Sequence, residues 1–167
     1  YTSTIEYADN GIAKSLRDVA RVHTANLGTQ IFYTAHGPFD THFNQPPMHA
    51  RLWTEVSAAI SDFFDDLREH GAADNLVMMI FTEFGRRVRD NGTGTDHGAG
   101  GGAFIIGDNV KGGMYGTYPS LKPEDLNQGG LDPNYDFRGF YSSVIDQWLG
   151  LDPVPIVGGQ FEQVQFA

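Results

Sequence analysis

The chain has 167 residues, enough for one domain of ordinary size with a sizeable core. Its composition, 40% hydrophobic and 19% charged, excludes a disordered or collagen-like chain, and the lack of cysteine excludes disulfides, zinc–thiolate sites and cysteine nucleophiles within it. The formal net charge of −10 repels nucleic acid and anionic membranes, so neither is an expected partner. This acidity either serves solubility or gathers carboxylates around cations.

Apolar residues at helical spacing predict a first helix over residues 11–27, with Asn10 as its cap and Gly28 as its stop. A short buried strand is predicted over residues 30–34. After a polar loop, apolar residues along one face predict a long amphipathic helix over residues 48–70.

The second half of the chain opens on a continuous apolar run, residues 75–82, of the kind found in central parallel strands. A long loop then leads to a strand over residues 103–106. A last helix is predicted over residues 137–149, and the alternating tail at 160–166 predicts an edge strand. None of the apolar runs is long enough to span a bilayer.

This alternation of helices and strands predicts a single α/β domain over residues 1–167, layered α/β/α with a mostly parallel sheet. In such a sheet, ligands bind beyond the carboxyl ends of the strands. The rule points to three loops, those that follow residues 34, 82 and 106.

Ligand-type side chains are densest in and beside these loops. Asp40 and His42 follow the first predicted strand, Glu83 follows the second, and Asp96 and His97 precede the third. Carboxylate oxygens and neutral imidazoles suit zinc, manganese or calcium-type ions. Spacing alone does not show that these side chains converge.

Simpler interpretations of the same residues stay open. Asp40 and His42 could form a hydrogen-bonded pair within one loop, and Glu83 could cap a turn. His36 is a candidate to orient the metal ligands without binding the metal itself. Arg86 could clamp an anionic substrate, or it could belong to a solvated run of arginines.

Five short stretches occur in order along the chain: FDTHFN at 39–44, FTEFGR at 81–86, GTDHG at 94–98, FIIGDNVKGG at 104–113 and DFRGFY at 136–141. Their sequences and order resemble the exported bacterial family called domain of unknown function 1501. That family is similar to the alkaline phosphatase superfamily, which includes sulfatases and cofactor-independent phosphoglycerate mutases. The resemblance implies an alkaline-phosphatase-like fold, of which this chain would be the carboxy-terminal portion.

The resemblance also implies roles for the ligand-type residues. Asp40 and His42 would supply one metal's ligands, and Glu83 would stand where the superfamily has an Asp-His pair. His97 would match a late histidine, with Asp96 as co-ligand or as its hydrogen-bonding partner. The Asp-x-His spacing and the Glu-Phe pair depart from the superfamily pattern. The metal could therefore be zinc, calcium, manganese or magnesium, and the number of metals is open.

The implied activity is in-line displacement on a small phosphate or sulfate ester, with Arg86 as a substrate-binding residue and metals polarising the ester oxygens. The superfamily's nucleophile lies ahead of anything in this chain, which begins without a methionine. We therefore expect the remainder of the same polypeptide to complete the site, and a periplasmic or secreted location. The alternative is a non-catalytic exported protein that keeps the fold for assembly or surface binding.

Overall fold

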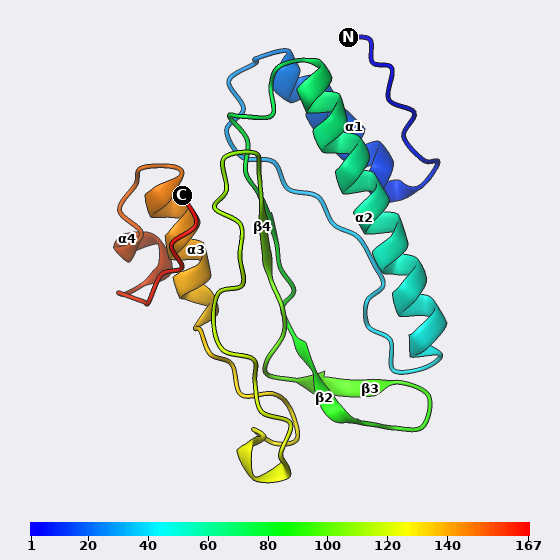
Figure 1. Ribbon diagram of the computed structural model, residues 1–167, viewed down its shortest axis with the longest axis vertical. Coiled ribbons are helices and arrows are strands. Elements are labelled where there is room, and N and C mark those ends of the chain that lie inside the picture. Colours follow the sequence, from blue (N-terminus) through cyan, green and yellow to red (C-terminus); the bar gives the residue numbers. More distant parts are fainter. The chain divides into compact units, whose positions relative to one another are not determined.

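The computed structural model describes residues 1–167 (Figure 1). The chain divides into two compact units. Unit 1 comprises Tyr1–Leu76 and the short segment Asn91–Thr95, and unit 2 comprises Val77–Asp90 and Asp96–Ala167. The chain therefore returns to unit 1 for a few residues in the middle of unit 2.

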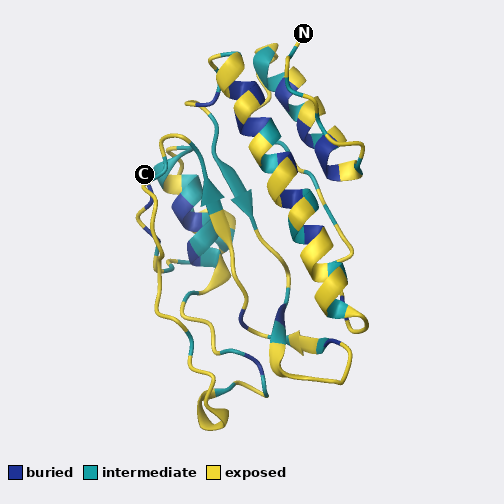
Figure 2. Cartoon of the chain, turned by 45° about the vertical axis from the view of Figure 1, so that its right-hand side comes forward, coloured by how far each residue is buried: buried dark blue, intermediate teal, exposed yellow.

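Unit 1 is built on two helices, α1 (Gly11–Thr24) and α2 (Gln45–Glu69), which pack against each other. The predicted cap of α1 is confirmed, because the Asn10 side chain accepts a hydrogen bond of 3.0 Å from the Ala13 amide. Buried and exposed residues alternate along both helices, as expected of amphipathic helices (Figure 2). The buried apolar residues of the two helices are Ile12, Ala13, Leu16, Ala20, Leu52, Val56, Ala59, Phe63, Phe64 and Leu67.

Helix α2 begins at Gln45, three residues before the predicted start. Pro46 and Pro47 occupy its first turn, where a missing amide hydrogen costs nothing and the fixed backbone angle suits a helix. Asn44, just before the helix, has a left-handed backbone with φ of 52°. The helix therefore starts directly after the loop that carries Asp40 and His42.

The strand predicted over residues 30–34 is wrong. This segment pairs with no other strand, and Ile31 and Tyr33 are exposed. A strand requires a neighbour that accepts and donates backbone hydrogen bonds, and a run of apolar residues does not supply one.

Unit 2 contains two separate two-stranded sheets. In the first, β1 (Met78–Ile80) runs antiparallel to β4 (Phe104–Ile106), with Met79 opposite Ile105. The second is the pairing of β2 (Gly85–Asp90) with β3 (Thr95–Gly98), in a stretch predicted to be a loop. The first residue of β3, Thr95, belongs to unit 1.

The layered α/β/α fold with a mostly parallel sheet, and with it the alkaline-phosphatase-like architecture, is therefore wrong for this chain. The apolar run at 75–82 predicted a central strand with neighbours on both sides. Only Met78–Ile80 is a strand, and it pairs with β4 alone, in the antiparallel direction. Hydrophobicity indicates burial but carries no information on the number or direction of a strand's partners.

The helical elements of unit 2 follow β4. They are a 3-10 turn, η1 (Pro123–Asp125), the long helix α3 (Phe137–Gln147) and the short helix α4 (Val154–Val157). The Asp136 side chain caps α3 by accepting a 2.9 Å hydrogen bond from the Arg138 amide. The helix agrees with its prediction except at its end.

The predicted edge strand at 160–166 is wrong, because the tail bonds to side chains of α3 instead of to a sheet. Ser143 Oγ accepts a hydrogen bond from the Val164 amide at 2.9 Å. Gln147 accepts one from the Phe166 amide at 3.1 Å and donates one to the Val164 carbonyl at 2.7 Å. The backbone amides and carbonyl of the tail therefore have hydrogen-bond partners on α3 and need no neighbouring strand.

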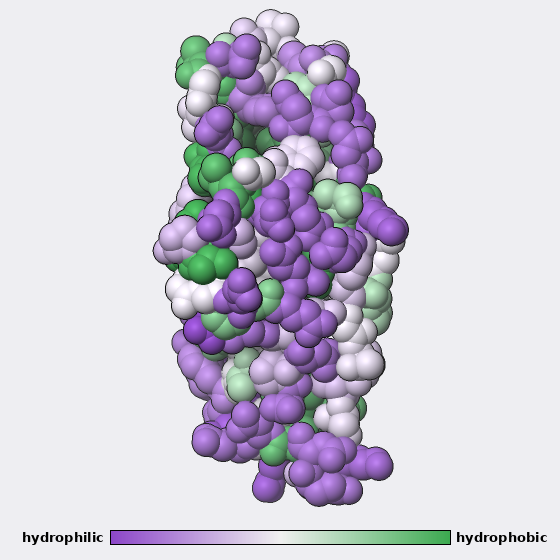
Figure 3. All heavy atoms as spheres, turned by 90° about the vertical axis from the view of Figure 1, so that its left-hand side faces the viewer, coloured by the Kyte–Doolittle hydropathy of each residue, from purple (hydrophilic) through white to green (hydrophobic).

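No helix combines the length and the apolar character that a bilayer crossing requires, in agreement with the sequence. Hydrophilic residues cover most of the face seen in Figure 3, and hydrophobic residues lie in small groups between them. Small groups of this kind are ordinary on a protein surface.

Candidate metal centre

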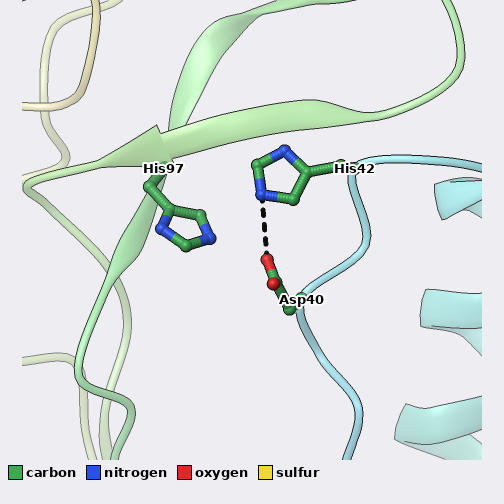
Figure 4. A group of neighbouring side chains, drawn as sticks. All are labelled: Asp40, His42 and His97. Atoms are coloured by element: carbon green, nitrogen blue, oxygen red, sulfur yellow. Dashed lines mark ion pairs between the residues drawn. The ribbon is translucent and has the colours of Figure 1, made fainter.

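Asp40 and His42 lie side by side in the loop before α2. His42 Nε2 is 3.0 Å from Asp40 Oδ1, and the side chains are 44% and 55% exposed respectively (Figure 4). Two ligands of a tetrahedral zinc ion, each bonded at about 2.0–2.1 Å, lie about 3.3 Å apart. The pair therefore has the spacing of two ligands of one cation, and it also makes an ion pair by itself when His42 is protonated.

Aromatic contacts hold this loop on α2. The Phe39 ring, next to Asp40, makes edge-on contacts with His36, His49 and Trp53, with ring centroids 5.6–6.0 Å apart. Thr41, which lies between Asp40 and His42, is buried, and its amide donates a hydrogen bond to the Phe39 carbonyl at 2.9 Å. The contacts of the Phe39 ring and the turn at Thr41 fix the loop, and the side chains of Asp40 and His42 stay exposed.

His36, predicted to support the metal ligands, lies beside α2. Its Nε2 is 3.3 Å from Glu55 Oε2, and its side chain is largely buried. Among the neighbours of His36, Phe39 is the one that belongs to the Asp40–His42 loop. A support role through Phe39 is therefore compatible with its position.

The segment Asn91–Thr95 packs against the same loop and the start of α2. The Asn91 side chain donates to the His42 carbonyl at 3.2 Å, and the Thr95 hydroxyl donates to Gln45 Oε1 at 3.1 Å. At Gly94 the fit is tight, since an added Cβ would lie 2.5 Å from the Thr41 carbonyl oxygen. The segment Asn91–Thr95 therefore lies beside the loop that carries Asp40 and His42.

His97 lies two residues beyond Thr95 on β3, and it is exposed (Figure 4). Because side chains alternate along a strand, Thr95 and His97 share one face of β3. The His97 ring stacks on Phe84, with centroids 3.9 Å apart and planes at 14°. Its carbonyl accepts a hydrogen bond from Arg87 Nε at 3.3 Å.

Arg86, the predicted anion-binding residue, contacts the same phenylalanine as His97, and all three residues belong to unit 2. Its guanidinium carbon lies 5.1 Å from the centre of the Phe84 ring, within the range of a cation–π contact. Phe84 is thus a shared platform for the imidazole of His97 and the guanidinium of Arg86.

Glu83 and Asp96 are placed differently from these residues. Glu83 is exposed in the irregular segment between β1 and β2, and within unit 2 it belongs to no group of three potential ligands. Asp96 is exposed on β3, where alternation places it on the opposite face from His97. Metal-binding roles for these two residues remain predictions from the sequence.

The sequence pattern did not predict the hairpin that carries Arg86 and His97. One signal was present: the dipeptide Asn91-Gly92 is typical of tight hairpin turns. The Asn91 side chain accepts hydrogen bonds from the amides of Thr93 and Gly94 at 3.2 and 2.9 Å. The flanking strands are polar, so hydrophobic patterning gave no indication of them.

Residues 15–153 match the family model described as "Protein of unknown function (DUF1501)". The chain belongs to this family. The match covers most of the chain and includes every residue of the candidate centre, so the family resemblance drawn from five motifs is confirmed. No curated protein and no solved structure matches the chain.

This DUF1501 chain thus offers three exposed groups suited to a cation: the Asp40 carboxylate and the imidazoles of His42 and His97. Neutral imidazole and carboxylate together suit zinc and manganese better than calcium and magnesium, which prefer oxygen ligands alone. Arg86, on the same platform as His97, is a group that pairs with phosphate or sulfate oxygens.

Proposed function

We propose that this chain supplies a divalent-cation site to a hydrolase of phosphate or sulfate esters, with Asp40, His42 and His97 as ligands. The observation that carries the proposal is the 3.0 Å pairing of Asp40 with His42. The remainder of the same polypeptide would contribute the nucleophile, as the similarity of the family to alkaline phosphatases and sulfatases implies.

The family resemblance supports His97 as the third ligand, because it matches this residue to a late histidine of the superfamily. Within β3, side-chain alternation places His97 on the face that also carries Thr95 and places Asp96 on the other face.

The bound cation would polarise the ester oxygens and lower the pKa of an attacking hydroxyl. Arg86 would bind the remaining oxygens of the anionic ester, because its planar guanidinium matches phosphate and sulfate geometry. A cation has a second effect in a protein with a net charge of −10, since it offsets the repulsion of an anionic substrate.

The test is zinc and manganese binding by calorimetry on the full-length protein, with hydrolysis of an aryl phosphate and an aryl sulfate measured alongside. We expect Asp40→Asn, His42→Ala and His97→Ala each to weaken binding tenfold or more, because each removes a ligand. Asp18→Asn is the matched control, since Asp18 is an exposed carboxylate on α1 paired only with Arg21. Absence of stoichiometric metal, or unchanged affinity in these variants, would refute the proposal.

The same experiment addresses a non-catalytic role in assembly or surface binding. Asp40 and His42 can form an ion pair without a cation, so their contact is compatible with a purely structural purpose. If the variants change the melting temperature or assembly, while the unaltered protein hydrolyses no ester at any metal concentration, the non-catalytic function is the correct one.

A further inference from the structure

We propose that Phe84 is a positioning residue for the cation site, fixing the His97 imidazole for coordination and Arg86 for anion binding. The inference rests on the proposed function and extends it to a residue that cannot itself bind a metal. It is carried by the two contacts of the Phe84 ring: parallel stacking with His97 at 3.9 Å and the Arg86 guanidinium at 5.1 Å.

The orientation of the stack is compatible with coordination. The lone pairs of an imidazole lie in the plane of its ring. A ring stacked face to face on Phe84 therefore directs its nitrogens sideways, past the edge of the phenyl ring. Phe84 restricts rotation of His97 and leaves a nitrogen available to a cation.

The backbone around Phe84 is built for close approach. An added Cβ at Gly85 would lie 1.7 Å from the Gly100 carbonyl oxygen, and one at Gly98 would lie 2.6 Å from the Arg86 carbonyl oxygen. Real Cβ atoms do not tolerate such distances, so both positions require glycine. The close contact holds the backbones beside Phe84 and His97 together.

Phe84 does not serve as a core residue. Its side chain is only half-buried, and it is absent from the buried hydrophobic residues of the protein. Both of its ring contacts are with polar side chains predicted from the sequence to act on metal or substrate. A phenylalanine kept only for packing would be expected to bury its ring against apolar neighbours.

The first measurement is the proton NMR spectrum of the His97 ring in the metal-free full-length protein, assigned by its loss in His97→Gln. Stacking shields the imidazole protons through the ring current of Phe84. We expect their resonances to move downfield in Phe84→Leu and to stay in place in Phe84→Tyr. Identical His97 resonances in the unaltered protein and in Phe84→Leu would overturn the inference.

The second measurement is zinc affinity. Phe84→Leu should weaken binding about three- to tenfold, the usual cost of immobilising one side chain on binding. Phe84→Tyr should restore affinity to within about twofold, because it retains the stacked ring. Phe81→Leu is the matched control: Phe81 is a neighbouring exposed phenylalanine whose ring contacts Tyr141 instead.

The two proposals fail in different ways. If His97→Gln weakens zinc binding and Phe84→Leu does not, His97 is a ligand and the positioning role of Phe84 is wrong. If the unaltered protein binds no zinc, the proposed function is wrong. The role of Phe84 in positioning His97 to bind a cation is then wrong as well. The NMR measurement then still decides whether Phe84 holds the His97 ring.

Discussion

At the scale of single residues, Gly139 marks the closest approach between α3 and the tail. A Cβ at this position would lie 2.0 Å from the Glu162 carbonyl oxygen, well inside contact distance. Gly139→Ala must therefore push the tail off α3 and strain its bonds to Ser143 and Gln147. We expect a loss of about 1–3 kcal/mol in the free energy of unfolding, measured by urea denaturation.

Gly11→Ala is the control for this prediction. Gly11 is the first residue of α1, its backbone angle is not left-handed, and nothing lies within 4 Å of an added Cβ. The substitution should leave stability unchanged or raise it by up to about 1 kcal/mol, because it restricts the unfolded chain. Equal losses in the two variants would show that close packing at Gly139 is not the cause.

Residues of the candidate centre differ in how far the sequence could predict them. Asp40 and His42 were predictable as a pair because they lie two residues apart in one loop, so no distant contact is needed to bring them together. The stacking of His97 on Phe84 depends on the pairing of β2 with β3, which no local pattern indicated. Glu83 was selected by a rule for the ends of parallel strands, and β1 belongs to no parallel sheet.

At the scale of elements, the turn between β2 and β3 is fastened by Asn91. Its Oδ1 accepts bonds from the amides of Thr93 and Gly94, and its Nδ2 donates to the His42 carbonyl. Asn91→Ala removes these three bonds and loosens the segment Asn91–Thr95 from the Asp40–His42 loop. We expect zinc affinity in a calorimetric titration to fall about three- to tenfold, in line with about 0.5–1.5 kcal/mol for one hydrogen bond.

Asn127→Ala is the matched control, because Asn127 is exposed and bonds to Gly130 only through its backbone. It should bind zinc as the unaltered protein does. Full zinc affinity in Asn91→Ala would mean that Asn91 does not position the Asp40–His42 loop for metal binding.

The elements that the sequence predicted well are those whose stability is local. Helices α1 and α3 and their caps follow from apolar spacing and from one capping side chain each, Asn10 and Asp136. Strands depend on partners far along the chain. The apolar segment at 30–34 has none, and the tail at 160–166 bonds to α3 instead.

At the scale of the whole molecule, the pH dependence of stability should be dominated by the fastening of the N-terminal segment to α2. Buried Asp66 accepts hydrogen bonds from the hydroxyls of Tyr1 and Tyr7, the latter at 2.8 Å. Glu69 accepts bonds from the amide and hydroxyl of Thr4. His70 lies with one ring nitrogen 2.8 Å from the Asp66 carbonyl oxygen and the other 2.9 Å from the Thr2 carbonyl oxygen.

These contacts shift the pKa values of Asp66, Glu69 and His70, among others. Burial opposes the charge on Asp66, but hydrogen bonds from Tyr1, Ser3 and Tyr7, together with the charge of His70, outweigh it and lower its pKa. The bonds from Thr4 lower the pKa of Glu69. The Asp66 carbonyl, together with that of Thr2 and the nearby carboxylates, raises the pKa of His70, because two carbonyl acceptors favour an imidazolium that donates from both nitrogens.

The signs of these shifts define a window of maximal stability. A carboxylate with a lowered pKa stabilises the fold above its unfolded pKa, and this stability is lost as pH falls through the folded value. A histidine with a raised pKa stabilises below its unfolded pKa, and this stability is lost as pH rises through the folded value. The ordinary pKa values are 3.8 for Asp66, 4.5 for Glu69 and 6.5 for His70. All three groups therefore contribute their full stabilisation between pH 4.5 and 6.5.

Thermal unfolding followed by circular dichroism should therefore give a melting temperature that is highest in this window and falls on both sides. His70→Gln removes the charged donor, so it should lower the maximum and flatten the decline above pH 6.5. His23→Gln should retain the decline, because His23 faces the Ala72 carbonyl and the Asn75 side chain instead of the N-terminal segment. A melting temperature that stays constant from pH 6 to 8, or a decline unchanged in His70→Gln, would show that His70 does not fasten the segment as an imidazolium.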